Sequence, residues 1–351
     1  MRGELRMIIK SIKAENYTVF ENTSIQFSKG INVFIGENAT GKTHMLKLLY
    51  SASTSSHAGT DFSNKIVRTM LPDDFKISRL VTRKQGYHQA KVTVIATEEN
   101  IYQDKRLTVA FDKNTKKWDA EVTGKDGWEK TFGNDVSIFI PAKEILSHSY
   151  QLSAATSVGN VRFDDTYIDI INSAKIDISM GKNPANRAAM LNRIETMTNG
   201  TVVYDAKKDE FYLKKGNSKQ EFNLVAEGVK KMGLVWLLAK NGTLESGSVL
   251  YWDEPEANIN PSYISIIADL LLELQRRGVQ IFLATHNYFL AKYIDIKKSE
   301  KDNVSFYSFY KKDDEKWVQC EGATDFGLLQ NNSIMETYIK IYRDEIGVVL
   351  S

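Results

Sequence analysis

The sequence predicts a mixed α/β protein, and three kinds of stretch lead to this expectation. An apolar run at residues 30–35 leads into a glycine-containing loop, and a helix-like stretch follows at residues 44–50. Two more predominantly apolar runs, at residues 249–252 and 279–284, have the length of buried strands and are followed by polar residues. Residues 91–128 instead alternate apolar and polar side chains, which is typical of an antiparallel meander. We therefore expect an α/β core that carries an antiparallel β-subdomain.

The loop at residues 36–43 reads Gly-Glu-Asn-Ala-Thr-Gly-Lys-Thr and matches the G-x-x-x-x-G-K-[ST] pattern of phosphate-binding loops. Its two glycines permit a turn in which backbone N–H groups point inward and, with the positive end of the next helix, form a nest for a β-phosphate. We expect Lys42 to reach the β- and γ-phosphates and the Thr43 hydroxyl to ligate Mg²⁺. The sequence therefore predicts that ATP and Mg²⁺ are bound here, by Gly36, Glu37, Asn38, Ala39, Thr40, Gly41, Lys42, Thr43 and His44.

Two acids follow the apolar run at residues 249–252, and a histidine follows the run at residues 279–284. A carboxylate at the end of a strand can hold Mg²⁺ through water, so Asp253 is the second metal candidate. Glu254 points elsewhere because side chains alternate along a strand, and it is the candidate general base. His286 would end a neighbouring strand, where it can hydrogen-bond a γ-phosphate or the attacking water. The predicted catalytic residues are thus Glu254, His286 and Lys42.

The order of these motifs resembles that of the ABC-type ATPase superfamily, and above all of the single-chain ATPases related to RecF, SMC and OLD proteins. The resemblance implies a P-loop NTPase fold with an ABC-type ATPase core, an antiparallel β-subdomain and a helical lid insertion. It also implies an opening hairpin at residues 7–27, with Asn16 near the base and sugar of the nucleotide. Residues 253–261 resemble the Walker B motif and D-loop, residues 285–290 resemble the His-switch, and residues 138–144 resemble the strand before the Q-loop.

One motif departs from the pattern of this superfamily. ABC-type ATPases place a signature, Ser-x-Gly-Gln/Glu, at a helix start before Walker B, where it contacts the γ-phosphate bound by a partner subunit. Here Ala226 stands at the serine position and Val229 at the acid or amide position, whereas Gly228 is kept. We expect ATP-driven dimerisation in which Gly228 approaches the partner's nucleotide, with slow hydrolysis. The alternative interpretation is that this segment is only a core helix.

The chain divides into three predicted parts. Residues 1–142 form an N-terminal ATPase lobe with Walker A and the β-meander. Residues 143–200 form a helical lid or arm, which is too short and too poor in heptads for the long arms of SMC proteins. Residues 201–351 form a C-terminal ATPase lobe with the signature-like helix, Walker B and the His-switch. Only 65 residues (351 − 286) follow His286, so we expect no nuclease domain of the kind that OLD proteins carry.

Five smaller elements are expected along the chain. Residues 51–62 are rich in Ser, Thr and Gly and indicate a mobile loop, and residues 124–127 indicate a turn. Residues 201–214 and 303–319 indicate hairpins, and residues 334–342 indicate a helix.

Composition limits the class of protein and its compartment. Of the 351 residues, 42% are hydrophobic, which is enough for a core and excludes a disordered chain. The net charge of +2 neither requires nor excludes nucleic acid, and most of the basic pairs, a set that includes Lys230-Lys231, are interpreted as solvated faces. A single cysteine, Cys320, fits a reducing compartment. Because no apolar stretch reaches the ~18 residues of a membrane span and charges interrupt the N-terminus, we expect a cytoplasmic protein without a membrane partner.

The leading functional hypothesis is an ATPase that uses ATP as a switch. Two copies would enclose ATP, hydrolyse it slowly and regulate a separate effector, such as a nuclease or toxin in bacterial anti-phage defence; this role is inferred by analogy alone. One alternative is a RecF-like DNA-repair ATPase that binds DNA directly. Another is a nucleotide-locked scaffold with negligible hydrolysis.

Overall fold

The structure is a computed structural model, and it describes residues 6–99, 103–157, 159, 162–178, 185–312 and 315–350. The strands are β1 Met7–Tyr17, β2 Phe20–Gln26, β3 Ile31–Ile35, β4 Gln89–Glu98, β5 Lys105–Asp112, β6 Glu121–Thr123, β7 Ser137–Ile140, β8 Thr201–Asp205, β9 Glu210–Lys215, β10 Ser218–Glu221, β11 Val249–Asp253, β12 Gln280–Thr285, β13 Val304–Tyr310 and β14 Gln319–Ala323. The α-helices are α1 Lys42–Thr54, α2 Phe62–Met70, α3 Lys125–Phe132, α4 Leu152–Ser157, α5 Asp165–Ala174, α6 Ala185–Thr198, α7 Glu227–Lys240, α8 Ile264–Arg276, α9 Tyr288–Lys297 and α10 Ser333–Leu350.

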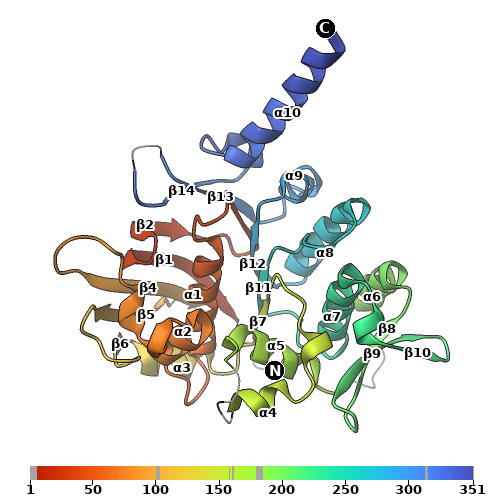
Figure 1. Ribbon diagram of the computed structural model, residues 1–351, viewed down its shortest axis with the longest axis horizontal. Coiled ribbons are helices and arrows are strands. Elements are labelled where there is room, and N and C mark those ends of the chain that lie inside the picture. The colour runs from red at the N-terminus through yellow and green to blue at the C-terminus, as the bar shows by residue number, and fades with distance from the viewer. Residues whose placement is uncertain are drawn as a thin grey trace.

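The central sheet has the order β14-β13-β3-β12-β11-β7, and all of its neighbouring pairs are parallel except β13 with β14. In β12, Ile281 and Leu283 enter one hydrophobic core, whereas Phe282 and Ala284 enter another. This alternation buries the sheet on both faces, which explains why its strands are almost continuously apolar. Figure 1 shows α1 and strands β1, β2, β4 and β5 on one side of this sheet and α7 and α8 on the other.

Two antiparallel sheets complete the fold. A five-stranded sheet, β2-β1-β4-β5-β6, shares one hydrophobic core with α1 and the inner face of the central sheet. A three-stranded sheet, β10-β9-β8, packs with α7 in the other core. The expected α/β core, antiparallel β-subdomain and helical segment, here α4 to α6, are therefore all present.

The pairing register brings the functional ends of three strands to one edge. Asp253 of β11 pairs with Ala284 of β12, and Thr285 of β12 pairs with Ile35 of β3. Ligands of open parallel sheets bind beyond the carboxyl ends of the strands. The residues that follow β3, β11 and β12 therefore share one site.

The expected loop at residues 51–62 is wrong over its first part. Helix α1 continues to Thr54, and residues 51–56 are buried. The hydroxyls of Ser51, Ser53 and Thr54 donate to the carbonyls four residues earlier, at 2.7, 3.0 and 2.9 Å. These bonds satisfy the side chains inside the helix, so small polar residues can be buried there.

Three other expectations need adjustment. The expected turn at residues 124–127 is the start of α3, which begins after a left-handed Gly124 and buries Trp128. The hairpin at residues 201–214 is present as β8–β9, with β10 as an additional strand. In the last hairpin the second strand begins at Gln319 rather than at residue 316, and residues 313–314 of its expected tip lie outside the described residues.

Candidate functional site

The phosphate loop joins β3 to α1 as the sequence predicts. Gly36 has a φ of 150° and lies against β13, so that a Cβ atom there would be 2.2 Å from the carbonyl oxygen of Phe309. Gly41 caps α1 in the left-handed conformation, with a φ of 86°. The ammonium of Lys42 lies inside the loop and donates to the carbonyls of Gly36 at 2.8 Å and Glu37 at 2.6 Å. The loop backbone and Lys42 thus form a cationic cradle that fits a nucleotide phosphate.

The two candidate metal ligands lie next to each other. The hydroxyl of Thr43 is 3.1 Å from each carboxylate oxygen of Asp253, although the two residues are far apart in the sequence. Burial raises the pKa of Asp253 to about 6, while the Thr43 hydrogen bond opposes this shift. A hydroxyl and a carboxylate beside a phosphate cradle are the oxygen ligands that Mg²⁺ prefers. The residues present therefore fit a magnesium–nucleotide complex.

The candidate base and the candidate switch histidine are also together. Oε1 of Glu254 is 3.4 Å from Nδ1 of His286, and both side chains are partly exposed. Glu254 has a φ of 47°, an uncommon conformation for a non-glycine residue. Its N–H still donates to the carbonyl of Ala284 at 2.9 Å, so the backbone turns only after the β11–β12 pairing is complete. This turn directs the Glu254 carboxylate toward the site edge, where His286 follows β12.

Two residues that support this edge were not selected from the sequence. Lys231 of α7 is buried, and its ammonium donates to the carbonyls of Glu254 at 2.8 Å and Ala257 at 3.0 Å. Burial lowers the pKa of Lys231 to about 8. Glu256 is buried as well and accepts a 2.6 Å hydrogen bond from Thr285, the residue before His286. The interpretation of Lys230-Lys231 as a solvated face is wrong, because both lysines lie inside the fold.

The only sequence signals for these two residues were their positions. Lys231 lies one turn into the helix that precedes Walker B, and Glu256 lies two residues after Glu254. Neither position distinguishes a buried charge from a solvated one, because the partners are carbonyls and hydroxyls from other elements.

Among the described residues, the side chains of Asn16 and His44 form no hydrogen bond with the side chains of Lys42 or Asp253. The side-chain amide of Asn16 donates to the carbonyl of Gln89 at 2.9 Å, and it is Val19 and Phe20 from the same hairpin that pack against Gly41. His44 is half-buried beside the loop, and burial lowers its pKa.

Gly228 lies at the start of α7, where the loop after Walker B passes close to the helix. A Cβ atom at this position would be 2.7 Å from the carbonyl oxygen of Asn258. The signature-like segment therefore packs closely against the loop that follows Glu254 in the same chain.

Comparison with known proteins agrees with this geometry. The model of the family described as "AAA domain, putative AbiEii toxin, Type IV TA system" matches residues 31–292, more than half of the chain. The chain belongs to this family. Curated relatives that it matches include DNA replication and repair proteins named RecF. That of Bacteroides fragilis is 27% identical over 181 residues, which is 51% of this chain and 43% of that protein. The chain spans less than half the length of the curated relatives it matches.

Solved structures agree on the fold. An Smc head bound to the C-winged helix domain of ScpA has a TM-score of 0.59 at 11% identity, over 90% of this chain and 98% of that one. An Smc head with an extended coiled coil, bound to the C-terminal domain of ScpA from Pyrococcus furiosus, has a TM-score of 0.53 at 10% identity. It covers 96% of this chain and 99% of that one. The protein thus shares the fold of the SMC heads, and the family match together with the RecF relatives supports an ABC-type ATPase of the RecF/SMC family. In the part of the chain that the structure describes, no helix is both long and apolar enough to cross a membrane.

Proposed function

We propose that this ATPase is a slow, ATP-driven dimerisation switch that regulates a separate effector protein. The observation that carries the proposal is the convergence of one complete set of nucleotide groups at one sheet edge. Lys42, the Thr43–Asp253 pair and the Glu254–His286 pair come from three neighbouring strands and reach this edge together.

Each group has a defined task in this proposal. Bound Mg²⁺ would withdraw charge from the phosphates, and Thr43 and Asp253 would hold it. Lys42 would exchange its two carbonyl partners for phosphate oxygens. Glu254 would orient the attacking water and accept its proton, and His286 would donate a hydrogen bond to the γ-phosphate. The left-handed backbone of Glu254 and its anchor on Lys231 would keep the carboxylate in place during this reaction.

The second half of the site is proposed to come from another copy of the chain. Helix α7 begins at Glu227, its N-cap residue Ala226 makes no side-chain cap, and both residues are exposed. The first N–H groups of a helix attract anions. We infer that these N–H groups, close to Gly228, meet the γ-phosphate held by a partner copy.

The replacement of the signature serine supports slow turnover. Ala226 lacks the hydroxyl that would stabilise the partner's γ-phosphate, so the contact relies on backbone groups alone. A long-lived ATP-bound dimer suits a switch better than a motor. The family description refers to a toxin and a toxin–antitoxin system, which supports a link to a toxin, whereas the separate effector and the role in anti-phage defence are proposed by analogy.

The test compares the mass of the assembly in different nucleotide states. Glu254→Gln should bind Mg-ATP without hydrolysing it, and light scattering should then give a dimer or larger assembly. The same variant with ADP, or with EDTA, should give the lower mass. Affinity capture from the source cells in both states identifies an effector. An unchanged mass in every nucleotide state would contradict the switch.

The RecF relatives favour one second candidate, a DNA-repair ATPase that binds DNA itself. This function predicts ATP-dependent binding to duplex ends or gaps that weakens as salt increases. Capture of DNA and no effector by the ATP-bound assembly would favour it over the switch.

A further inference from the structure

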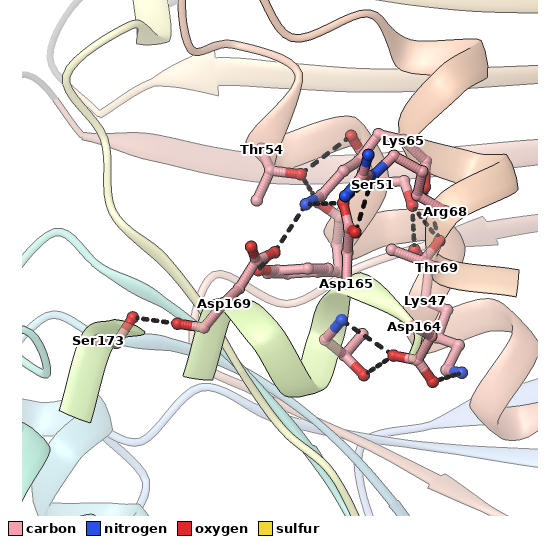
Figure 2. A network of polar contacts seen from close by, with 12 residues as sticks. Lys47, Ser51, Thr54, Lys65, Arg68, Thr69, Asp164, Asp165, Asp169 and Ser173 are labelled. Atoms are coloured by element: carbon pink, nitrogen blue, oxygen red, sulfur yellow. Dashed lines mark hydrogen bonds and ion pairs between the residues drawn. The ribbon is translucent and has the colours of Figure 1, made fainter. Parts of the chain in front are cut away.

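An ionic network joins the helical segment to the phosphate-loop helix. Figure 2 shows three aspartates of one segment, Asp164, Asp165 and Asp169, facing basic side chains of α1 and α2. Asp164 caps α5, and its Oδ1 accepts the N–H of Thr166 at 2.9 Å. The cap therefore fixes the first aspartate at the end of the helix.

Two of the aspartates are held mainly by α2. The ammonium of Lys65 lies 2.8 Å from Asp165 and 2.7 Å from Asp169, and Nε of Arg68 lies 2.8 Å from Asp165. Tyr50 of α1 donates to Asp169 at 2.6 Å. Since Lys65 and Asp165 are largely shielded from water, these contacts attach α5 firmly to α2.

The third aspartate has a different partner. Asp164 is paired with Lys47 of α1 at 2.9 Å, and both side chains are mostly buried. Lys47 lies one helical turn after Thr43, on the helix that begins at the phosphate loop. The hydroxyl of Thr43 is 3.1 Å from each carboxylate oxygen of Asp253, so Lys47 lies one turn of α1 beyond the contact between this helix and Asp253.

Lys47 therefore joins Asp164, the N-cap of α5, to the helix whose first turn contacts Asp253. Tyr167 lies near both carboxylates. Its pKa is raised to about 12 by burial and, to a smaller extent, by the negative charges of Asp164 and Asp253.

We propose that Lys47 is a positioning residue of the magnesium site, held away from Asp253 by Asp164. The inference rests on the proposed binding of Mg-ATP. While Asp164 holds the ammonium, the Asp253 carboxylate remains available as a metal ligand. If Asp164 is neutralised, the ammonium loses its paired anion and turns toward Asp253, where it competes with the cation.

The same arrangement couples the metal site to α5. A divalent cation beside Asp253 repels the Lys47 ammonium toward Asp164 and so tightens the pair across α1 and α5. By linkage, a tighter pair favours cation binding by the same factor. The helical segment thus senses whether the site holds Mg²⁺.

The test measures the Mg²⁺ concentration at which a fluorescent ATP analogue is half-bound. Asp164→Asn retains an N-cap side chain and should raise this Mg²⁺ midpoint about 5- to 10-fold, within the range typical of coupled sites. Lys47→Met removes the competing cation, so adding Asp164→Asn to it should cause no further shift. Asp165→Asn is the matched control, because it breaks ion pairs of the same helix with α2 and leaves Lys47 in place.

The outcomes separate the possible failures. An unchanged midpoint in Asp164→Asn, or the same shift in Asp165→Asn, would overturn the positioning role. As a second readout, Mg-nucleotide should slow hydrogen exchange in α5 of the wild type and not in Asp164→Asn. A wild-type protein that binds no ATP analogue at any Mg²⁺ concentration would overturn the proposed function and this inference together.

Discussion

Asp135 is a buried carboxyl group outside the nucleotide site, and its replacement by asparagine should stabilise the protein. The backbone N–H of Met7 faces its side chain and opposes a rise in the pKa, and among the described residues Oδ2 has no hydrogen-bond partner. Glu98, also buried, lies close enough to act on it. Burial, reinforced by the charge of Glu98, raises the pKa of Asp135 from 3.8 to about 7.

The size and sign of the effect follow from this shift. A difference of about three pKa units corresponds to about 4 kcal/mol at ~1.36 kcal/mol per unit. A raised carboxyl pKa means that the folded state keeps its proton longer than the unfolded state. The decrease in the free energy of unfolding that the Asp135 charge causes is therefore absent below pH ~4. It grows as the pH rises to about 7 and is complete above that. Asp135→Asn retains the acceptor for Met7 and removes the charge, so we expect a gain of about 2–4 kcal/mol at pH 8.

The assay is guanidinium unfolding of the nucleotide-free protein at pH 4.5 and pH 8. The difference between Asp135→Asn and wild type should be small at pH 4.5 and large at pH 8. Asp302→Asn is the control of opposite sign, because its hydrogen bond to Arg276 lowers the pKa of Asp302 to about 2. The free energy of unfolding of that variant should be about 1–2 kcal/mol lower than that of the wild type at pH 8, after allowance for solvent screening at the half-exposed Arg276. An Asp135→Asn protein that is less stable than wild type at pH 8, or changed in stability equally at both pH values, would show that the charge of Asp135 does not destabilise the fold.

Two further substitutions probe the nucleotide site. Gly36→Ala would place a Cβ atom 2.2 Å from the Phe309 carbonyl oxygen. This variant should therefore not bind a fluorescent ATP analogue, and its unfolding midpoint should be lower than that of the wild type. Binding equal to wild type would show that the loop can move away from β13. Lys231→Met should retain ATP binding and reduce phosphate release by about 10- to 100-fold, because the Glu254 carbonyl loses its anchor and small displacements of catalytic groups are costly. Unchanged phosphate release in that variant would show that Lys231 does not position Glu254 for hydrolysis.

The fold could be predicted from the sequence because each signal was local. The apolar runs that became β3, β11 and β12 were continuous, and the phosphate loop stood between a strand and a helix. The family resemblance then supplied the ABC-type core, the antiparallel β-subdomain and the helical insertion. By contrast, residues 51–54 were expected in a loop because they are small and polar. Their composition does not reveal that the hydroxyls donate to carbonyls of their own helix. The division into three parts and the roles of the candidate site residues remain predictions.

The rest of the site depends on contacts between distant segments. The sequence placed Asp253 and Glu254 at a strand end, but it gave no sign that Lys231 would be buried against the turn after them. The Lys47–Asp164 pair joins residues 117 positions apart, across two segments that were assigned to different parts of the chain. The composition gives the number of charged residues but does not say which of them form ion pairs. Only the packed structure therefore distinguishes a buried ion pair from a solvated one.

The central claim is that Glu254, at the end of β11, drives hydrolysis of ATP held by the Lys42 loop. The most direct measurement is phosphate release at saturating Mg-ATP, in parallel with ATP affinity, for wild type and Glu254→Gln. We expect slow, Mg²⁺-dependent release by the wild type and a decrease of at least ~100-fold in the variant, with affinity preserved. Equal phosphate release by the two proteins would contradict this role of Glu254.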